Sequence, residues 1–309
     1  MRNNLVFLYP GQGSQQVGMG LDLYQIYPEA RYKFDQADNL LGFSIKRLCF
    51  EGPAEELNQD LNAQLAIYTV SCVLTDVLGA DNVLPDVVSG YSSGFYAAAY
   101  AAGCFDFAIG LYLVKRAGEI LLDEGLKIDG GMAVIFGLPI GEVESICQQL
   151  GNVEVSIANT PRQAIISGLN NSVEKAMEAA LVQDALDAYL LPVAVPYHSR
   201  FVEQSSSRLL DEIEEIHLRD PQLPLISYHF LESVVDKRHL KYVIASQLSR
   251  PVLWVDLIKK LRGCHRLFVE VGPGAVISRT VKWIDRSIEI VKTGTNEMLL
   301  KSIAEWRKR

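Results

Sequence analysis

The segment DVVSGYSSGFYAAAYAAG (86–103) constrains the fold more than any other stretch of the chain. A β-branched run ends at Gly90, and the alanines after Gly94 favour a helix. Between them, Gly90-x-Ser92-x-Gly94 has the spacing of a strained strand-to-helix turn that exposes its serine, with glycines that let strand and helix approach. The same residues also fit the start of a tightly packed helix. The pattern therefore offers Ser92 as a candidate nucleophile and leaves the structural alternative open.

The regions on either side of this segment alternate predicted strands with predicted helices. Apolar runs at 5–10, 223–230 and 267–274 have the length and composition of buried strands. Apolar residues at helical spacing and alanine content predict helices over 20–39, 55–80, 94–102, 108–122, 201–217, 238–248 and 251–262. This alternation predicts an α/β fold in which helices cover both faces of a parallel sheet.

The region 127–196 follows a different order of elements. Strand-like runs and helical runs succeed one another at 127–139, 140–150, 153–159, 163–168, 172–184 and 190–196. This β-α-β-β-α-β order is the ferredoxin-like pattern. It predicts a small subdomain at 127–196, inserted into a large subdomain made of residues 1–126 and 197–309.

Charge and cysteine usage exclude several classes of protein. The net charge of −8 argues against a general nucleic-acid binder. Five scattered cysteines without a CxxC pair indicate reduced thiols, and five dispersed histidines predict no metal site. No apolar run approaches the ~18–20 residues that span a bilayer, and the first residues lack the form of a secretory signal. We therefore expect a cytoplasmic protein without a membrane partner.

A serine nucleophile needs a base, and His198 is the best candidate. It follows the apolar run VAVP on a predicted loop, from which it can reach across to Ser92. His217, His229 and His239 lie in charged or surface-like segments, and His265 precedes a strand. A structural or solvated role for His198 stays open.

Arg116 lies among apolar residues in the predicted helix 108–122. A buried guanidinium must be paired or must bind a ligand, because an isolated buried charge is costly. Two interpretations are equally compatible with the sequence. Arg116 either clamps a substrate carboxylate or forms an ion pair with Glu119 or Glu124.

The turn PGQGSQQVG (10–18) directly follows the first predicted strand. It lacks the third glycine of GxGxxG and the GK[ST] ending of a phosphate loop, so we expect no nucleotide site. Backbone N–H groups of such a turn can instead bind an oxyanion. The N–H of Ser93, the residue after the candidate nucleophile, would complete that site.

Six features occur in an order and spacing that resemble the malonyl-CoA:acyl carrier protein transacylases and the acyltransferase domains of polyketide synthases. They are YPGQGSQ, GYSSG, Arg116, VPYHS, QLSRPVLW and EVGPG. The resemblance covers essentially the whole chain. It implies an α/β-hydrolase-like parallel-sheet domain with an inserted ferredoxin-like subdomain, in agreement with the insertion predicted from the residues.

The resemblance also implies catalytic roles. Ser92 matches the acyl-accepting serine, and His198 matches its base. Gln12 and Ser93 match the positions whose backbone amides form the oxyanion hole. Gln247 matches the glutamine whose main-chain carbonyl orients the histidine in place of a triad carboxylate.

Four further residues match substrate-binding positions of the family or stand beside the reacting groups. Arg116 matches the arginine that holds the malonyl carboxylate, and Asn159 matches an asparagine that lines the pocket. Tyr91 replaces a usual histidine and carries no positive charge near neutrality. Tyr197 is bulky where methylmalonyl-selective members carry a small residue. We therefore expect malonyl rather than a branched analogue.

The implied reaction is a ping-pong transfer of malonyl from malonyl-CoA to the pantetheine thiol of an acyl carrier protein, without a cofactor. Three alternatives stay open. These are a serine acyl hydrolase or thioesterase, a transacylase for a different acyl group in a polyketide or other malonyl-using pathway, and a carrier-protein binder without activity. A basic cluster could dock the acidic carrier protein or could simply be solvated: Lys259, Lys260, Arg262, Arg266, Arg279, Lys282 and Arg286.

Overall fold

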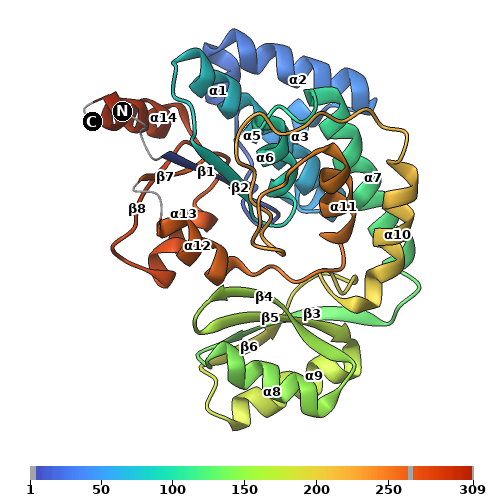
Figure 1. Ribbon diagram of the computed structural model, residues 1–309. Coiled ribbons are helices and arrows are strands. Elements are labelled where there is room, and N and C mark those ends of the chain that lie inside the picture. The colour runs from blue at the N-terminus through green and yellow to red at the C-terminus, as the bar shows by residue number, and fades with distance from the viewer. Residues whose placement is uncertain (1–4, 264–266, 308–309) are drawn as a thin grey trace.

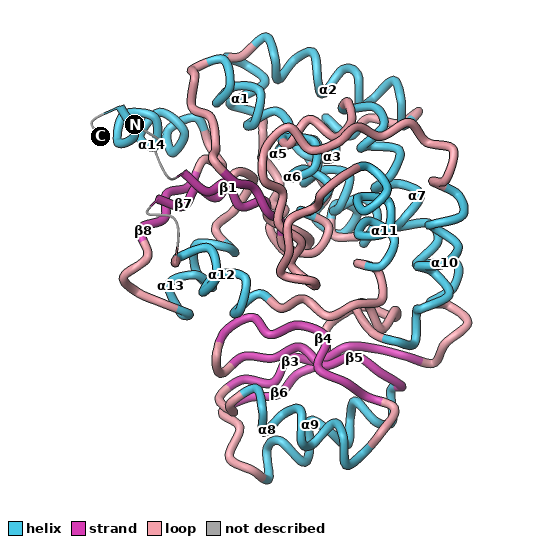
Figure 2. Tube along the Cα trace, in the orientation of Figure 1, coloured by secondary structure: helices cyan, strands magenta, loops and turns pink. Residues whose placement is uncertain are grey.

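Two separate sheets organise the protein, which a computed structural model describes over residues 5–263 and 267–307 (Figure 1, Figure 2). The first sheet is parallel. Its strand β1 (Leu5–Tyr9) lies between β2 (Val87–Gly90) and β7 (Leu267–Glu270), and β8 (Glu289–Lys292) pairs with β7. All of β1 is buried, as expected for a central strand with helices on both sides.

The helices around the parallel sheet come from both long flanking regions of the chain. They are α1 (Leu21–Ile26), α2 (Pro28–Leu41), α3 (Ile45–Glu51), α4 (Ala54–Leu57), α5 (Asp60–Ala80), α6 (Gly94–Ala101), α7 (Phe107–Gly125), α10 (Glu203–Glu212), α11 (Lys237–Ser246), α12 (Trp254–Arg262), α13 (Val276–Ile284) and α14 (Asn296–Arg307), with a 3-10 turn at Arg200–Val202. By length and composition alone α5 could cross a membrane. However, 78% of its most apolar window is buried inside the protein, which is typical of a core helix.

The second sheet is antiparallel and has the strand order β4-β5-β3-β6. Its elements are β3 (Gly130–Phe136), α8 (Ile140–Leu150), β4 (Val153–Thr160), β5 (Gln163–Leu169), α9 (Asn170–Val182) and β6 (Asp187–Leu190). Figure 1 shows α8 and α9 on the face that points away from the rest of the molecule. A core of its own lies between these helices and the sheet. The ferredoxin-like order expected from the sequence is confirmed.

All strands of the antiparallel sheet lie between the predicted boundaries at 127 and 196, and all strands of the parallel sheet lie outside them. The division into a large subdomain and an inserted small one stays a prediction. Together, the parallel sheet and the separate antiparallel sheet confirm the α/β fold class.

Several predicted elements are wrong, two of them because of proline. The helix expected over 20–39 is broken at Tyr27, whose extended backbone precedes Pro28. The strand expected at 190–196 is instead β6, which ends at Leu190, before two prolines that cannot donate to a ladder. The segment 223–230 forms only isolated bridges, at Leu225 and Ile226, and then turns. Three elements, α3, α14 and β8, were not predicted.

Candidate active site

Ser92 lies on a sharp turn between β2 and α6, with a left-handed backbone (φ 52°). This conformation is costly for serine unless the surrounding structure enforces it. Two glycines allow it. A Cβ at Gly90 would lie 2.2 Å from the carbonyl carbon of Gly94, and one at Gly94 would lie 2.1 Å from the Tyr9 carbonyl oxygen. The geometry is therefore that of the strained turn rather than an ordinary helix start, and Ser92 lines a cavity.

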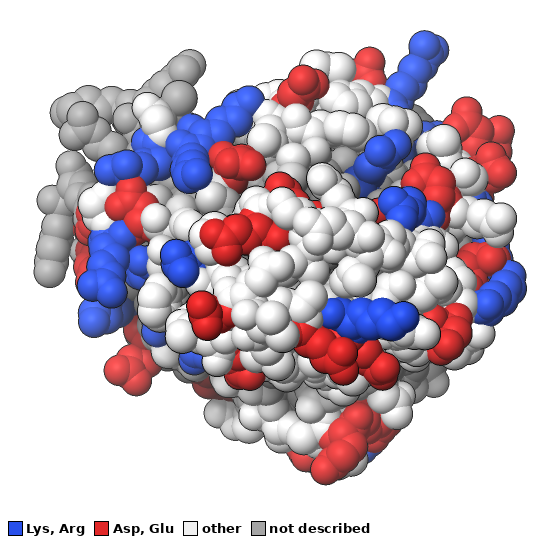
Figure 3. Space-filling model, turned by 90° about the horizontal axis from the view of Figure 1, so that it is seen from below, with Lys and Arg blue, Asp and Glu red and all other residues white. Residues whose placement is uncertain are grey.

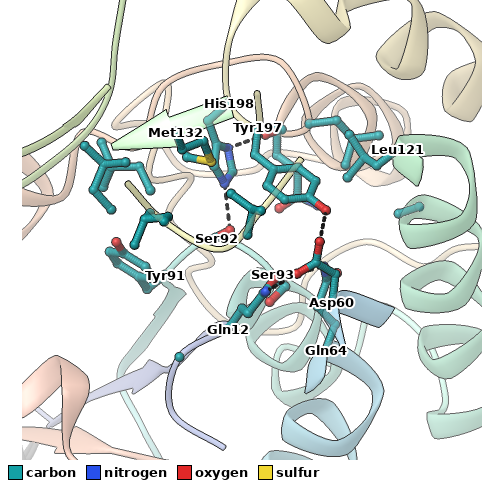
Figure 4. Close-up of a pocket in the computed structure, with 18 of the residues that line it drawn as sticks. Gln12, Asp60, Gln64, Tyr91, Ser92, Ser93, Leu121, Met132, Tyr197 and His198 are labelled. Carbon is teal, nitrogen blue, oxygen red and sulfur yellow. Dashed lines mark hydrogen bonds between the residues drawn. The ribbon is translucent and has the colours of Figure 1, made fainter. Parts of the chain in front are cut away.

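His198 lies opposite Ser92, with its Nε2 2.7 Å from the serine Oγ (Figure 4). Its other ring nitrogen, Nδ1, lies 2.9 Å from the Gln247 carbonyl oxygen and 3.2 Å from that of Arg250. Carbonyl oxygens only accept, so Nδ1 carries the hydrogen and Nε2 is free to accept from the Ser92 hydroxyl. This tautomer is the one that a base for Ser92 requires.

Burial lowers the pKa of His198 to about 4, and the two carbonyl acceptors oppose this shift because they favour the protonated ring. The imidazole is therefore neutral near pH 7. Gln247, whose carbonyl orients the ring, is itself held. Its Nε2 donates to the Ile244 carbonyl and its Oε1 accepts from the Tyr228 hydroxyl.

Gln12 and Ser93 line the cavity beside Ser92. Ser93 is the N-cap of α6, and the first N–H groups of a helix have no acceptor within the helix. The loop that carries Gln12 presses against the turn, because a Cβ at Gly11 would lie 2.5 Å from the Tyr91 carbonyl oxygen. The two positions therefore fit a pair of amides beside the Ser92 hydroxyl.

The carboxylate of Asp60, on α5, contacts two loops that line the cavity, the one that carries Gln12 and the one that carries Tyr197. Oδ1 of Asp60 accepts from Gln12 Nε2 at 2.5 Å, and its Oδ2 accepts from the Tyr197 hydroxyl at 2.6 Å (Figure 4). Gln64, one turn further along α5, donates to Gln12 Oε1 at 3.4 Å. Asp60 was not predicted as a site residue. Its signal, an acidic residue at the first position of a long apolar helix, is also an ordinary helix start.

The cavity has a volume of about 430 Å³, within the range of small-molecule sites. Its apolar lining was not predicted from the sequence. The side chains come from α7, from the antiparallel sheet (called the small sheet below) and from the segment after it: Ala117, Leu121, Met132, Ile157, Ile165, Leu191 and Val193. No periodicity or motif could have brought these residues together, because their elements meet only in the folded chain.

Arg116 is not among the residues that line the cavity. Its Nη2 donates to both carboxylate oxygens of Glu212, at 2.9 and 2.7 Å, and its Nη1 pairs with Glu119. The next residue, Ala117, lines the cavity instead. Successive helix residues are rotated by about 100°, so α7 turns Arg116 toward α10 and Ala117 toward the cavity. The ion-pair alternative, with Glu119 rather than Glu124, describes Arg116, and the carboxylate clamp does not.

Tyr91 and Asn159 meet where the small sheet contacts the large part of the molecule. The Tyr91 hydroxyl donates to Oδ1 of Asn159 at 2.5 Å, and its ring packs edge-on against Trp254. Tyr91 lines the cavity, whereas Asn159 lies behind it and does not, contrary to the expectation from the resemblance. Burial raises the pKa of the Tyr91 hydroxyl, which therefore stays neutral.

The sequence predicted a charged or surface-like segment around His229, and this prediction is wrong. Its ring is buried and lies within hydrogen-bond distance of the hydroxyls of Ser227 and Ser246. Within residues 5–263 and 267–307 no group of three His, Cys, Asp or Glu side chains could hold a metal ion. Four cysteines there are free and buried, while Cys264, His265 and Arg266 lie outside the described residues.

The turn, the histidine and the two amide positions have the arrangement that acyl transfer by a serine nucleophile would need. Residues 6–303 match the family model described as acyl transferase domain, and the chain belongs to this family.

A curated relative, the malonyl CoA-acyl carrier protein transacylase of Bacillus subtilis (strain 168), is 33% identical over 98% of this chain and 98% of its own length. The solved malonyl CoA-acyl carrier protein transacylase of Coxiella burnetii has a TM-score of 0.94 at 31% identity and covers 99% of this chain and 98% of its own. A malonyl-transacylase solved in complex with its type II PKS acyl-carrier protein has a TM-score of 0.93 at 27% identity, covering 97% of this chain and 99% of its own.

Proposed function

We propose that this chain is an [acyl-carrier-protein] S-malonyltransferase, which moves malonyl from malonyl-CoA to the pantetheine thiol of an acyl carrier protein. The observation that carries the proposal is the 2.7 Å contact between Ser92 Oγ and His198 Nε2, with Nδ1 fixed as donor by two carbonyls. We infer the acyl group, malonyl, and the acceptor, an acyl carrier protein, from the names of the relatives.

In the first half-reaction, His198 Nε2 takes the proton of the Ser92 hydroxyl while Oγ attacks the thioester carbonyl carbon. The backbone amides of Gln12 and Ser93 bind the oxyanion that forms. The carbon–sulfur bond then breaks, and His198 returns the proton to the CoA thiolate. An acyl ester remains on Ser92.

In the second half-reaction, the carrier-protein thiol loses its proton to His198 and attacks the ester carbonyl. The carbon–oxygen bond breaks, Ser92 regains its proton from His198, and the acyl group leaves as a thioester. Chain residues carry every proton in this scheme, and the proposed reaction uses no cofactor. We place it in the cytoplasm, where the CoA thioester and the carrier protein meet.

Incubation with malonyl-CoA followed by intact-mass measurement tests the proposal. We expect one malonyl adduct on the wild-type chain, none on Ser92→Ala, and transfer of the adduct to added holo carrier protein. Equal labelling of Ser92→Ala would contradict the proposal. Release of free malonate instead of transfer would indicate a hydrolase.

A second candidate, a transacylase for a different acyl group, is favoured by one observation. Ala117 lines the cavity, and Arg116, which was expected to bind a substrate carboxylate, is engaged with Glu212. The reaction type would be unchanged, since Ser92 and His198 would act on the thioester carbonyl and not on the distal end of the acyl group.

Exposed basic residues supply a candidate docking surface for the acidic carrier protein. In Figure 3, blue groups gather on the side where α12 and α13 lie in Figure 1. Of the predicted basic cluster, the exposed members are Lys259, Lys260, Arg262, Arg279, Lys282 and Arg286. Reversing the charge of Lys282 and Arg286 should raise the KM for carrier protein and spare that for malonyl-CoA, whereas Lys175→Glu on α9 should change neither.

A further inference from the structure

The cavity around Ser92 offers no cation to a charged acyl group. Among the described residues that line it there is no lysine or arginine. Its one imidazole, His198, is already held between the Ser92 hydroxyl and two backbone carbonyls. A carboxylate on the acyl chain would therefore find only neutral donors.

The cavity does contain an anionic group. The Asp60 carboxylate accepts hydrogen bonds from two neutral donors, Gln12 Nε2 and the Tyr197 hydroxyl. In the part of the chain that the structure describes, no lysine or arginine lies within ion-pair distance of Asp60. Its negative charge is thus uncompensated by a cation, and it would repel a second carboxylate in the same cavity.

The remaining wall suits an uncharged chain. Ala117 and Leu121 of α7 lie on one side, and Met132, Ile157 and Ile165 of the small sheet complete an apolar lining. Transferring a carboxylate from water into such surroundings without an ionic partner is costly, whereas an acetyl or butyryl chain gains from burial there.

We infer that this cavity does not select a carboxylated acyl group, and that uncharged short acyl groups, from acetyl to butyryl, load Ser92 at least as fast as malonyl. The inference rests on the proposed acyl-serine function and specifies its substrate class. Asp60 and Ala117 are the residues that set this selectivity, one by its charge and the other by the guanidinium that it lacks.

The test is the rate of adduct formation on the full chain from acetyl-, propionyl-, butyryl- and malonyl-CoA, followed by quenched intact-mass measurement. We expect the uncharged thioesters to react at least as fast as malonyl-CoA. A preference of more than tenfold for malonyl would overturn the inference and leave the acyl-serine function standing. No adduct from any thioester would overturn the proposed function and this inference with it.

Two variants locate the cause. Ala117→Arg supplies the missing guanidinium and should raise the malonyl-to-acetyl ratio by about ten- to hundred-fold, the range of a charge-assisted hydrogen bond. Asp60→Asn keeps the size of the side chain and removes its charge, and it should raise the malonyl-to-acetyl ratio a few-fold. This variant tests the inference even if Ala117→Arg does not fold. Arg116→Ala is the matched control, with no expected change. A tenfold loss of malonyl loading in that control would contradict the inference.

Discussion

The hydroxyl of Tyr197 donates to Oδ2 of Asp60 across 2.6 Å and so joins the loop of the proposed base to the first turn of α5. Because Asp60 also holds the Gln12 side chain, one carboxylate links the base loop to the proposed oxyanion loop. The Tyr197 side chain is partly buried, and this burial, together with the proximity of Asp60, raises the pKa of its hydroxyl.

Tyr197→Phe removes this link and keeps the ring. We expect a loss of about 1.5–3 kcal/mol in the free energy of unfolding, since a hydrogen bond to a charged group is broken and Asp60 loses a partly buried donor. Chemical denaturation measures it. Tyr112→Phe, on an exposed side chain, should change stability by less than about 0.5 kcal/mol. Equal effects of the two substitutions would contradict the role of the contact.

The pH dependence of acylation should follow the depressed pKa of His198, about 4 because of burial. A neutral ring is the active form, so the rate of Ser92 loading should stay constant from pH 8 down to about pH 5.5 and fall only at lower pH. Measuring kcat/KM for an acyl-CoA against pH checks this. An acid limb with a midpoint at or above 6.5 would show a solvated histidine instead.

The free energy of unfolding should also fall as the pH is lowered. The pKa of His198 is about 4 and that of His229 about 3 in the folded chain, both lowered chiefly by burial from 6.5. Between pH 6.5 and these values the unfolded chain binds more protons, so the stability from the two neutral rings is full above pH 6.5 and is lost as pH falls. Denaturation midpoints at pH 7.5 and 5 measure the loss. Replacing His229 by glutamine should reduce the pH dependence.

Arg116→Ala should affect stability slightly and acylation not at all. The pair with Glu212 is partly exposed, with side-chain exposures of 27% and 28%, and Arg208 remains within ion-pair distance of Glu212. We expect a loss of about 0.5–1 kcal/mol that shrinks in high salt. Denaturation at two salt concentrations and the rate of malonyl adduct formation are the measurements. Loss of the adduct with intact stability would restore a role in substrate binding.

Gly94→Ala should abolish the adduct on Ser92. The new Cβ would lie 2.1 Å from the Tyr9 carbonyl oxygen, so strand and helix must separate and the turn must change shape. The expected loss of stability is about 1–3 kcal/mol or more. Gly141→Ala, where no atom lies within 4 Å of the added Cβ, is the matched control and should leave loading unchanged. Normal loading by Gly94→Ala would contradict the steric account of the turn.

The features that depend on local pattern could be predicted from the amino-acid sequence. The β-branched run, the spacing Gly90-x-Ser92-x-Gly94 and the alanines after it predict a strand, a turn and a helix, and the structure contains all three. The ferredoxin-like order of 127–196 could also be predicted, because strand and helix patterns are recognisable within about ten residues, although the last strand lies earlier than predicted. His198 could be predicted as the base because it follows an apolar run on a predicted loop, from which its side chain can reach Ser92.

The surroundings of Ser92, in contrast, depend on how distant parts of the chain pack together. A shift of one residue along α7 rotates a side chain by about 100°, so Arg116 pairs with Glu212 while Ala117 lines the cavity. Asp60 became part of the site only when α5 packed beside two loops that are distant in sequence. Selectivity depends on which helix faces converge in space, and that convergence is fixed by long-range packing rather than by any local pattern.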